Sequence, residues 1–255
     1  MQINGLAEIA DQYDAMLFDQ FGVLHDGTKP YPHAIAVLEE LKSRDIPVAV
    51  ITNSGKRADA NIARLVNMGI RRELFASCIS SGEIAFQSLK TKGQAYIIGK
   101  RGEDYGFDGI TITEQPEAAD FLLILGSNAP ETSMDAYREL LRYLKAPAIC
   151  CNPDKWMLTK QGLAPAPGAI AALYEELGGK VTWIGKPYPQ IYQKAAQSIG
   201  AGARVLCVGD SAEHDVAGGQ AAGFDTYLVL TGVSQGLDPS ALNPQPEYYS
   251  VDLRW

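Results

Sequence analysis

Short, continuous apolar runs recur along the chain, and amphipathic stretches separate them. The runs are residues 15–18, 48–51, 95–98, 121–125, 148–151, 181–184, 204–208 and 226–230. Most of them are apolar throughout rather than alternating, which is typical of strands buried on both faces of a parallel sheet. Helical spacing of apolar residues marks stretches 33–43, 58–67, 190–200 and 215–223. This alternation of strands and helices predicts an α/β fold with right-handed crossovers.

One of the predicted helices shows which face we expect to be buried. Residues 58–67 bring Ile62, Leu65 and Val66 together on one side, and Gly69 follows as a helix stop. The tail from residue 235 is polar and contains proline, so it is expected to be surface coil until about Tyr248. The tail's aromatic residues Tyr248, Tyr249 and Trp255 are candidates to dock on the core.

Composition narrows the class of protein. A chain of 255 residues can bury a core domain and a smaller inserted one, and its 46% apolar and 20% charged residues are ordinary for a soluble globular protein. No apolar run approaches the roughly 18 residues that span a bilayer. A net charge of −8 without a basic patch argues against nucleic-acid binding. The start lacks a secretory signal and the cysteines form no C-x-x-C pair, so we expect a cytoplasmic protein with reduced, mostly buried thiols.

A carboxylate ends the first apolar run. Asp19 follows residues 15–18 directly, and a glycine turn begins at Gly22. Ligands of open parallel sheets bind beyond the carboxyl ends of the strands, so Asp19 is placed where catalysis happens. Taken alone, an Asp that caps the next turn would explain it as well.

Hydrogen-bonding groups follow the run 48–51. Thr52 and Asn53 can donate to an anion, together with backbone N–H groups at the start of the next helix. Ser54 could simply cap that helix, and the two interpretations are compatible.

Two further segments bring charge to strand ends. Lys186 lies in a Gly-Lys-Pro segment, a constrained loop, where it could neutralise a carboxylate and a phosphate. Asp210 and Asp215 follow the run 204–208 around a tight loop. Two carboxylates so arranged suit a hard cation such as Mg²⁺. A solvated acidic turn is the alternative for this pair.

These four segments, in this order, resemble the four motifs of the haloacid dehalogenase-like (HAD) superfamily. The first motif, D-x-D-G-[VT]-L, matches DQFGVL at 19–24, and the fourth, G-D-x-x-x-x-D, matches residues 209–215. The second and third motifs match Thr52 and Lys186. TNS at 52–54, CNPD at 151–154, GKP at 185–187 and LTGV at 230–233 resemble subfamily IIA, which includes nitrophenylphosphatase-like and sugar-phosphatase-like proteins.

The resemblance implies a Rossmann-like parallel-sheet core with an inserted α/β cap domain. The core would comprise residues 1–81 and 179–255, and the cap residues 82–178. Such a cap closes over the site, excludes bulk water and contacts the leaving group.

Candidate specificity residues fall in two segments. Asn152, Asp154 and Lys155 belong to or follow the CNPD segment, although an Asn-Pro-Asp turn explains it equally well. Lys56 could face the phosphate or be a solvated residue at a helix start. Trp156 is expected in the core.

By the same resemblance, Asp19 attacks phosphorus and forms an aspartyl-phosphate. Thr52, Asn53, Ser54 and Lys186 would bind the substrate phosphate, with Thr52 on a phosphoryl oxygen. Lys186 would also orient Asp19 and offset the charge that builds up on the phosphoryl group. The substrate would be a small phosphorylated metabolite, and a homodimer is compatible with the resemblance.

Mg²⁺ is the implied cofactor. It would bridge Asp19 and the phosphate, with Asp210 and the backbone carbonyl of Phe21 as direct ligands. Asp215 would lie behind these ligands or bind through water.

Phe21 departs from the family pattern. Most family phosphatases have Asp there, which protonates the leaving oxygen and then activates water, and general acid–base catalysis is worth ~10²–10⁴-fold. The first interpretation is a phosphatase that tolerates the loss, with water, His25, Glu213 or His214 as a substitute, and that favours aryl or acyl phosphates. The second is a weak or inactive protein that binds a phosphate ligand. The third is a metal-independent dehalogenase, ranked last because those enzymes share the aromatic residue but lack the paired carboxylates.

Overall fold

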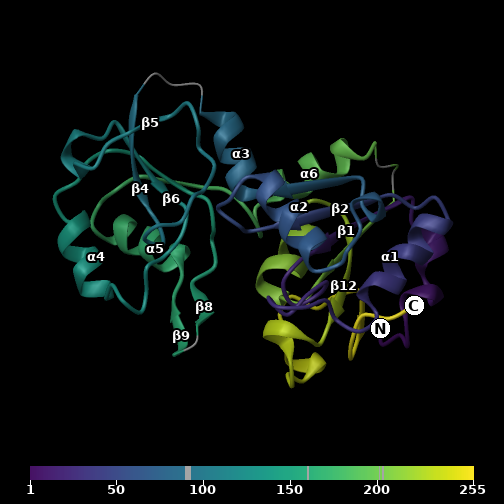
Figure 1. Cartoon of the computed structure of the whole chain (residues 1–255). Helices are drawn as coiled ribbons and strands as arrows, with labels where there is room; N and C mark the ends of the chain where they lie inside the picture. Colours follow the sequence, from purple (N-terminus) through teal and green to yellow (C-terminus); the bar gives the residue numbers. More distant parts are fainter. Residues whose placement is uncertain (90–92, 160, 201, 203) are drawn as a thin grey trace. The chain divides into compact units, whose positions relative to one another are not determined.

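The computed structural model describes residues 1–89, 93–159, 161–200, 202 and 204–255 (Figure 1). The described chain divides into two compact units. The first unit contains Met1–Thr52, Asn61–Ile79 and Lys186–Trp255, and the second contains Asn53–Ala60 and Ser80–Gly185. The second unit therefore extends beyond the predicted inserted domain, residues 82–178, at both ends and takes in the segment after β2.

The first unit is built on a parallel sheet. Over the described residues it has six strands in the order β13-β12-β11-β1-β2-β3. Their bounds are β1 Ala15–Asp19, β2 Val48–Thr52, β3 Ser77–Ser80, β11 Val205–Gly209, β12 Asp225–Val229 and β13 Tyr248–Ser250. Every residue of β1 and β11 is buried, as expected for strands covered on both faces. The predicted parallel α/β core is confirmed.

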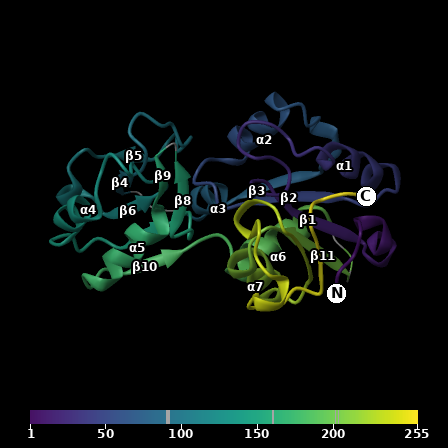
Figure 2. The same ribbon diagram turned by 90° about the horizontal axis from the view of Figure 1, so that it is seen from below.

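Helices cover both faces of this sheet. Figure 2 shows α1 and α2 on one face and α6 and α7 on the other. The helices are α1 Ala34–Ser43, α2 Ala58–Asn67, α6 Pro189–Ser198 and α7 Ala217–Ala221, and a π-helical turn, Ala212–Val216, precedes α7. Short 3₁₀ turns lie at Leu6–Glu8, Ala10–Gln12, Arg72–Leu74, Gly232–Ser234 and Pro239–Ala241.

Helix α2 buries a slightly different face from the one predicted. Leu65 is fully buried and Ile62 packs against the core, but Val66 is 43% exposed. Asn61 is buried instead. Residues 61 and 65 are four apart and share a side of the helix, whereas residue 66 lies about 100° further round. The expectation for Val66 was wrong.

The tail contributes to the core more than a coil would. Tyr248–Ser250 forms the edge strand β13, and Tyr227 pairs with Tyr248 in parallel register. Tyr248 and Trp255 pack against the first unit's hydrophobic cluster, and the Arg44 guanidinium lies 4.8 Å from the Trp255 ring centroid. The predicted docking is confirmed for Tyr248 and Trp255, while a strand at this place was not predicted.

The second unit has its own parallel sheet. In the part described, five strands run in the order β10-β7-β6-β4-β5. Their bounds are β4 Gln94–Ile98, β5 Thr111–Ile112, β6 Phe121–Ile124, β7 Ala148–Cys150 and β10 Val181–Trp183. The helices are α3 Ser81–Ser88, α4 Met134–Leu141 and α5 Pro167–Glu176, with a 3₁₀ turn at Pro116–Ala118. A separate antiparallel hairpin joins β8 Trp156–Thr159 and β9 Gly162–Pro165.

Two expectations about side chains have opposite outcomes. Trp156 is 64% exposed, so its placement in the core was wrong: it begins the separate hairpin of β8 and β9, outside the five-stranded sheet. All of the cysteines, Cys78, Cys150, Cys151 and Cys207, are buried and none forms a disulfide, as predicted.

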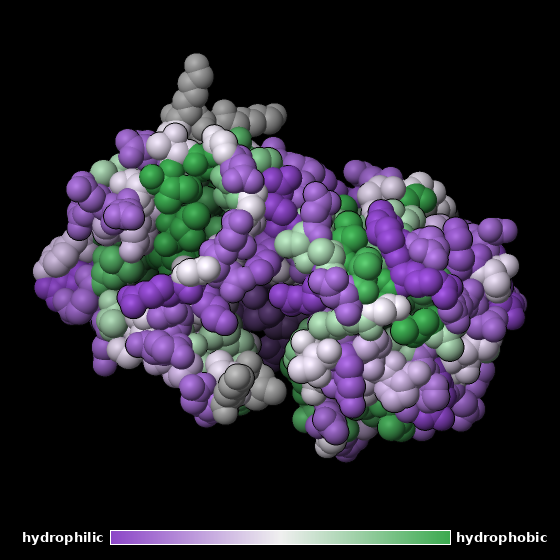
Figure 3. Space-filling view, viewed as in Figure 1, coloured by the Kyte–Doolittle hydropathy of each residue, from purple (hydrophilic) through white to green (hydrophobic). Residues whose placement is uncertain are grey.

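Polar residues dominate the surface in view. Figure 3 shows hydrophilic side chains over much of each unit, with apolar residues reaching the surface in patches. No helix in the described ranges has the length and apolar character needed to cross a bilayer.

Candidate active site

Asp19 stands at the carboxyl end of the central strand of the first unit. It is the last residue of β1 and is 8% exposed. Its Oδ1 accepts a hydrogen bond from the backbone N–H of Gln20 at 2.7 Å and lies 2.8 Å from Lys186 Nζ. β1 pairs with both β2 and β11, so groups that follow those strands end beside Asp19.

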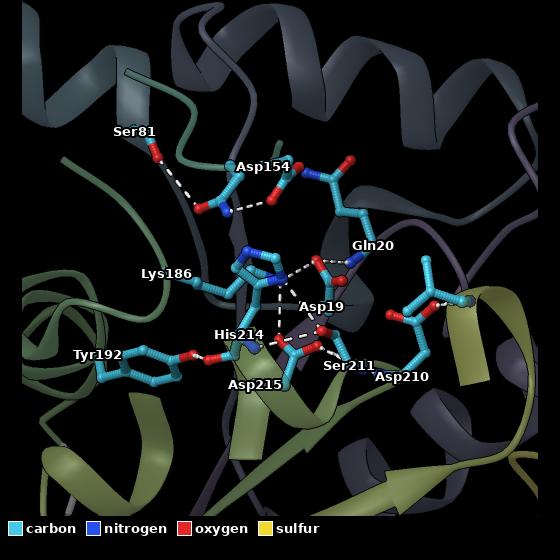
Figure 4. A network of polar contacts seen from close by, with 12 residues as sticks. Asp19, Gln20, Ser81, Asp154, Lys186, Tyr192, Asp210, Ser211, His214 and Asp215 are labelled. Carbon is cyan, nitrogen blue, oxygen red and sulfur yellow. Dashed lines mark hydrogen bonds and ion pairs between the residues drawn. The ribbon is translucent and has the colours of Figure 1, made fainter. Parts of the chain in front are cut away.

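Lys186 joins two carboxylates. Its ammonium is 2.8 Å from Asp19 Oδ1 and donates to Asp215 Oδ1 at 2.7 Å, and the residue is 3% exposed (Figure 4). Burial alone would lower the pKa of Lys186, but the charges of Asp19 and Asp215 outweigh it and hold the pKa above its ordinary value. Lys186 is therefore a permanent cation between these two carboxylates.

Asp215 is held by the loop that follows β11. It lies in the π-helical turn, and its Oδ2 accepts from the backbone N–H groups of Asp210 at 3.2 Å and Ser211 at 3.1 Å. A side chain at Gly209 would collide with Asp215. The carboxylate is thus fixed by backbone donors on one oxygen and by Lys186 on the other.

Asp210 lies between two glycine-containing loops. Its Oδ2 accepts from the backbone N–H of Val233 at 2.7 Å. Gly22, with φ +87°, and Gly232, with φ +52°, pack so closely on the carboxylate that neither has room for a Cβ. Thr231 Oγ1 donates to the carbonyl of Gly22 at 2.5 Å and ties the two loops together.

These carboxylates form one cluster. Among the described residues, oxygens of Asp19, Asp210 and Asp215 lie within 4.8 Å of one another. Burial raises the pKa of Asp19 to about 7, against the opposing charge of Lys186, and burial also raises the pKa of Asp210. Close carboxylates repel each other unless a cation or proton offsets them. One ammonium cannot balance all of them, and an all-oxygen set of this kind fits a hard divalent cation.

The second predicted motif is divided between the units. Thr52 is half-buried at the end of β2, whose Ile51 pairs with Asp19. Asn53 and Ser54 belong to the second unit. Asn53 Nδ2 donates to Asp154 Oδ1 at 2.8 Å, and Ser54 Oγ accepts from the N–H of Lys56 at 3.3 Å. The phosphate-binding roles of Thr52, Asn53 and Ser54 stay predictions. The Lys56 ammonium pairs with Glu103.

Phe21 is a 45% exposed side chain next to the cluster in sequence. Its ring meets His25 edge-on with 6.0 Å between centroids, and the N–H of Gly22 donates to the His25 carbonyl at 2.9 Å. His25 is 1% exposed, and burial, assisted by the charge of Arg64, lowers its pKa to about 4. At neutral pH its imidazole is uncharged.

The other candidate proton carriers differ in exposure. Glu213 is exposed, whereas His214 is half-buried with Nδ1 3.1 Å from Ser211 Oγ. His25 Nδ1 accepts from the N–H of Gly27 at 3.0 Å, and its Nε2 has no hydrogen-bond partner within the described part of the chain. Whether any of them replaces the missing acid stays a prediction.

The contacts of Thr231 and Val233 were not predicted. Residues 230–233 were noted for their resemblance to subfamily IIA but were assigned no role from the sequence. Val233 acts through its backbone N–H, which leaves no signature in residue type, and only the glycine after Thr231 could have indicated a close approach.

Comparisons with known proteins agree on one family. A family model described as haloacid dehalogenase-like hydrolase matches residues 16–110, and a second, HAD-hydrolase-like model matches residues 183–255. The 5'-nucleotidase YutF of Bacillus subtilis is 28% identical, over 88% of this chain and 89% of its own. The D-glycerol 3-phosphate phosphatase of Mycobacterium tuberculosis is 27% identical, over 98% of this chain and 72% of its own.

A solved structure gives the same picture. The p-nitrophenyl phosphatase from Archaeoglobus fulgidus aligns with a TM-score of 0.76 and 27% identity, covering 93% of this chain and 95% of that one.

Proposed function

Because this chain belongs to the haloacid dehalogenase-like hydrolases of the nitrophenylphosphatase-like subfamily IIA, we propose that it is a Mg²⁺-dependent phosphatase of small phosphomonoesters. One observation carries the proposal: Asp19, Lys186, Asp210 and Asp215 are buried together at the carboxyl end of the parallel sheet. That edge is where open α/β sheets bind ligands. Relatives named as phosphatases of a nucleotide and of a glycerol phosphate support this substrate class.

Asp19 is the proposed nucleophile. Within the described part of the chain, its contacts with Gln20 and Lys186 both fall on Oδ1, which leaves Oδ2 to attack phosphorus. The new O–P bond forms as the bond to the leaving oxygen breaks, which gives an aspartyl-phosphate. Water then attacks phosphorus, releases inorganic phosphate and restores the Asp19 carboxylate.

Lys186 and the metal ligands prepare this step. The two contacts of Lys186 orient the Asp19 carboxylate, and its ammonium offsets charge on the phosphoryl group. When bound, Mg²⁺ would be held by Asp19, Asp210 and the backbone carbonyl of Phe21, with Asp215 behind them or bound through water, and would supply further positive charge at the phosphate. Thr52 would bind a phosphoryl oxygen. The fit of this cation rests on the oxygen donors that the structure gathers.

Phe21 sets the preferred leaving groups. Its side chain cannot donate a proton, so leaving oxygens that depart as stable anions are favoured, as in aryl and acyl phosphates. A series of substituted aryl phosphates and one alkyl phosphate tests this preference. We expect kcat/KM to fall steeply as the leaving-group pKa rises. Phe21→Asp should raise the rate on the alkyl phosphate, up to the ~10²–10⁴-fold that acid catalysis supplies. A folded variant with unchanged or lower alkyl activity would contradict this account.

The second unit is proposed to act as the cap domain that selects the leaving group. It has a sheet and core of its own, which supports treating it as a separate module. The homodimer and the cytoplasmic location stay predictions.

Hydrolysis of p-nitrophenyl phosphate tests the main proposal. Turnover should require Mg²⁺, disappear in EDTA and fall to background in Asp19→Asn, which keeps the shape but removes the nucleophile. Acid quenching during turnover should trap phosphate on Asp19 in the parent protein. Phosphate binding without metal-dependent turnover beyond the Asp19→Asn control would instead support the ligand-binding alternative, and metal-independent halide release from a haloacid would support the dehalogenase.

A further inference from the structure

A buried amide connects two distant segments of the second unit. Asn53 is 6% exposed, and its Nδ2 donates to Asp154 Oδ1 at 2.8 Å. Ser81 Oγ donates to Asn53 Oδ1 at 3.5 Å. Since the nitrogen and the oxygen of the amide each have a partner, turning it over would break both contacts. Hydrogen bonds to a charged group are stronger than neutral ones, so Asp154 dominates the orientation of Asn53.

Gly185 packs directly on this amide. It has a φ of +121°, and a Cβ built there would lie 2.5 Å from Asn53 Oδ1 and 3.0 Å from Pro153 Cδ. The preceding residue, Ile184, donates its N–H to the Cys150 carbonyl at 2.9 Å. Ser81 Oγ lies closer still to that Cβ, at 2.3 Å, so the backbone that leads into Lys186 packs against the side chains of both Ser81 and Asn53.

Asp154 is itself fixed before it meets Asn53. Its N–H donates to Asn152 Oδ1 at 2.9 Å, and its carbonyl accepts from the N–H of Gly168 at 2.9 Å. Gly168 leaves no room for a side chain against Pro153 and Asp154. The carboxylate is thus presented from a rigid turn, which makes it suited to hold a partner in place.

We propose that Asp154 is a positioning residue that holds Asn53 against Gly185 and so fixes the backbone at Thr52 and Lys186. Thr52 is the residue before Asn53, and Lys186 is the residue after Gly185. The proposal rests on the proposed function, in which these two side chains act on the phosphate. A small displacement of either would slow phosphoryl transfer, because misplacement of a reacting group by about 1 Å can cost ~10²-fold.

The test is a set of variants of the whole chain assayed with p-nitrophenyl phosphate and Mg²⁺. Asp154→Ala and Asn53→Ala should each lower kcat by at least about tenfold with little change in KM, and the double variant should be no worse than the poorer single one. The exchanged pair, Asn53→Asp with Asp154→Asn, keeps one carboxylate–amide bond and should recover most of the lost rate. Asp108→Asn, which alters an exposed carboxylate of the same unit, should match the parent.

Three results would overturn the proposal. Additive losses would mean that the two residues act separately. A raised KM that the exchanged pair does not rescue would mean that Asp154 contacts the substrate itself. Unchanged kcat in both single variants would mean that the bond is dispensable.

A second readout does not need turnover. If the parent fails to hydrolyse any phosphomonoester, the proposed function fails. Amide hydrogen exchange at the backbone N–H groups of Thr52 and Lys186 still tests whether Asp154 positions these two residues. Exchange should be faster in each single variant and slow again in the exchanged pair. Equal exchange in parent and single variants would refute it.

Discussion

Lys186→Met should measurably lower the free energy of unfolding, because it leaves the buried carboxylate cluster without its ammonium. The change keeps much of the side chain's volume but removes the ammonium, which is 3% exposed and lies 2.8 Å and 2.7 Å from Asp19 and Asp215. Removing one partner of a buried ion pair typically costs about 3–5 kcal/mol. The cluster can limit the damage by binding one more proton than the parent does.

The free energy needed to bind that proton sets the size and the pH dependence of the loss of stability. Protonating a carboxyl whose ordinary pKa is 3.8 costs about 4 kcal/mol at pH 7, because each pH unit above the pKa adds about 1.4 kcal/mol. The variant gains the proton only in the folded state, so its stability deficit at pH 7 exceeds that at lower pH. It should shrink by about 1.4 kcal/mol per pH unit down to about pH 5.

Urea unfolding in EDTA measures this deficit. Of the tryptophans, Trp255 lies in the first unit and Trp156 and Trp183 in the second, so a background with phenylalanine at 156 and 183 lets Trp255 report the first unit alone. Lys42→Met, at an exposed lysine of the same unit, is the matched control and should change stability by less than about 0.5 kcal/mol. A deficit below about 1 kcal/mol, or one that does not vary with pH, would refute the electrostatic reasoning.

Three further predictions concern other parts of the structure. Gly22→Ala should weaken Mg²⁺ binding, measured by calorimetry, because the added methyl displaces the Asp210 carboxylate, whereas Gly69→Ala, at an uncrowded turn with a similar φ, should not. None of the cysteines should react with a thiol reagent at pH 8 until the protein unfolds, since all are buried and burial raises the pKa of Cys150 to about 12; reaction of the native protein would contradict the packing. His25, with its pKa lowered to about 4 from 6.5, must take up a proton to unfold below pH 6.5, so the parent should lose up to about 3 kcal/mol relative to His25→Gln between pH 6.5 and pH 4; parallel stability curves would argue against a buried neutral imidazole.

The central strands could be predicted from the sequence because each one is a run of consecutive apolar residues. β1, β2 and β11 are continuous apolar runs, and the polar residues that end them mark one edge of the sheet. β3 and β13 were missed since neither Ser77–Ser80 nor Tyr248–Ser250 is an apolar run. Pairing with a neighbouring strand, rather than local sequence, makes them strands.

The same distinction holds at the site. The order of the motifs predicted that Asp19, Lys186, Asp210 and Asp215 meet, and the structure brings them together. The bond between Asn53 and Asp154 joins residues 101 positions apart, and no local pattern indicates it. From the sequence alone, Asn53 was therefore interpreted only as a hydrogen-bond donor to an anion.

Neighbouring positions in the two loops around Asp210 differ sharply in their freedom to vary. Gly22 and Gly232 cannot accept a side chain, while Phe21 and Val233, each one residue away, are 45% and 65% exposed. Sequence drift, or a mutagenesis library, can therefore change the exposed side chains at positions 21 and 233 without disturbing the Asp210 carboxylate that the two glycines contact. New substrate ranges would be expected to arise at those two places first.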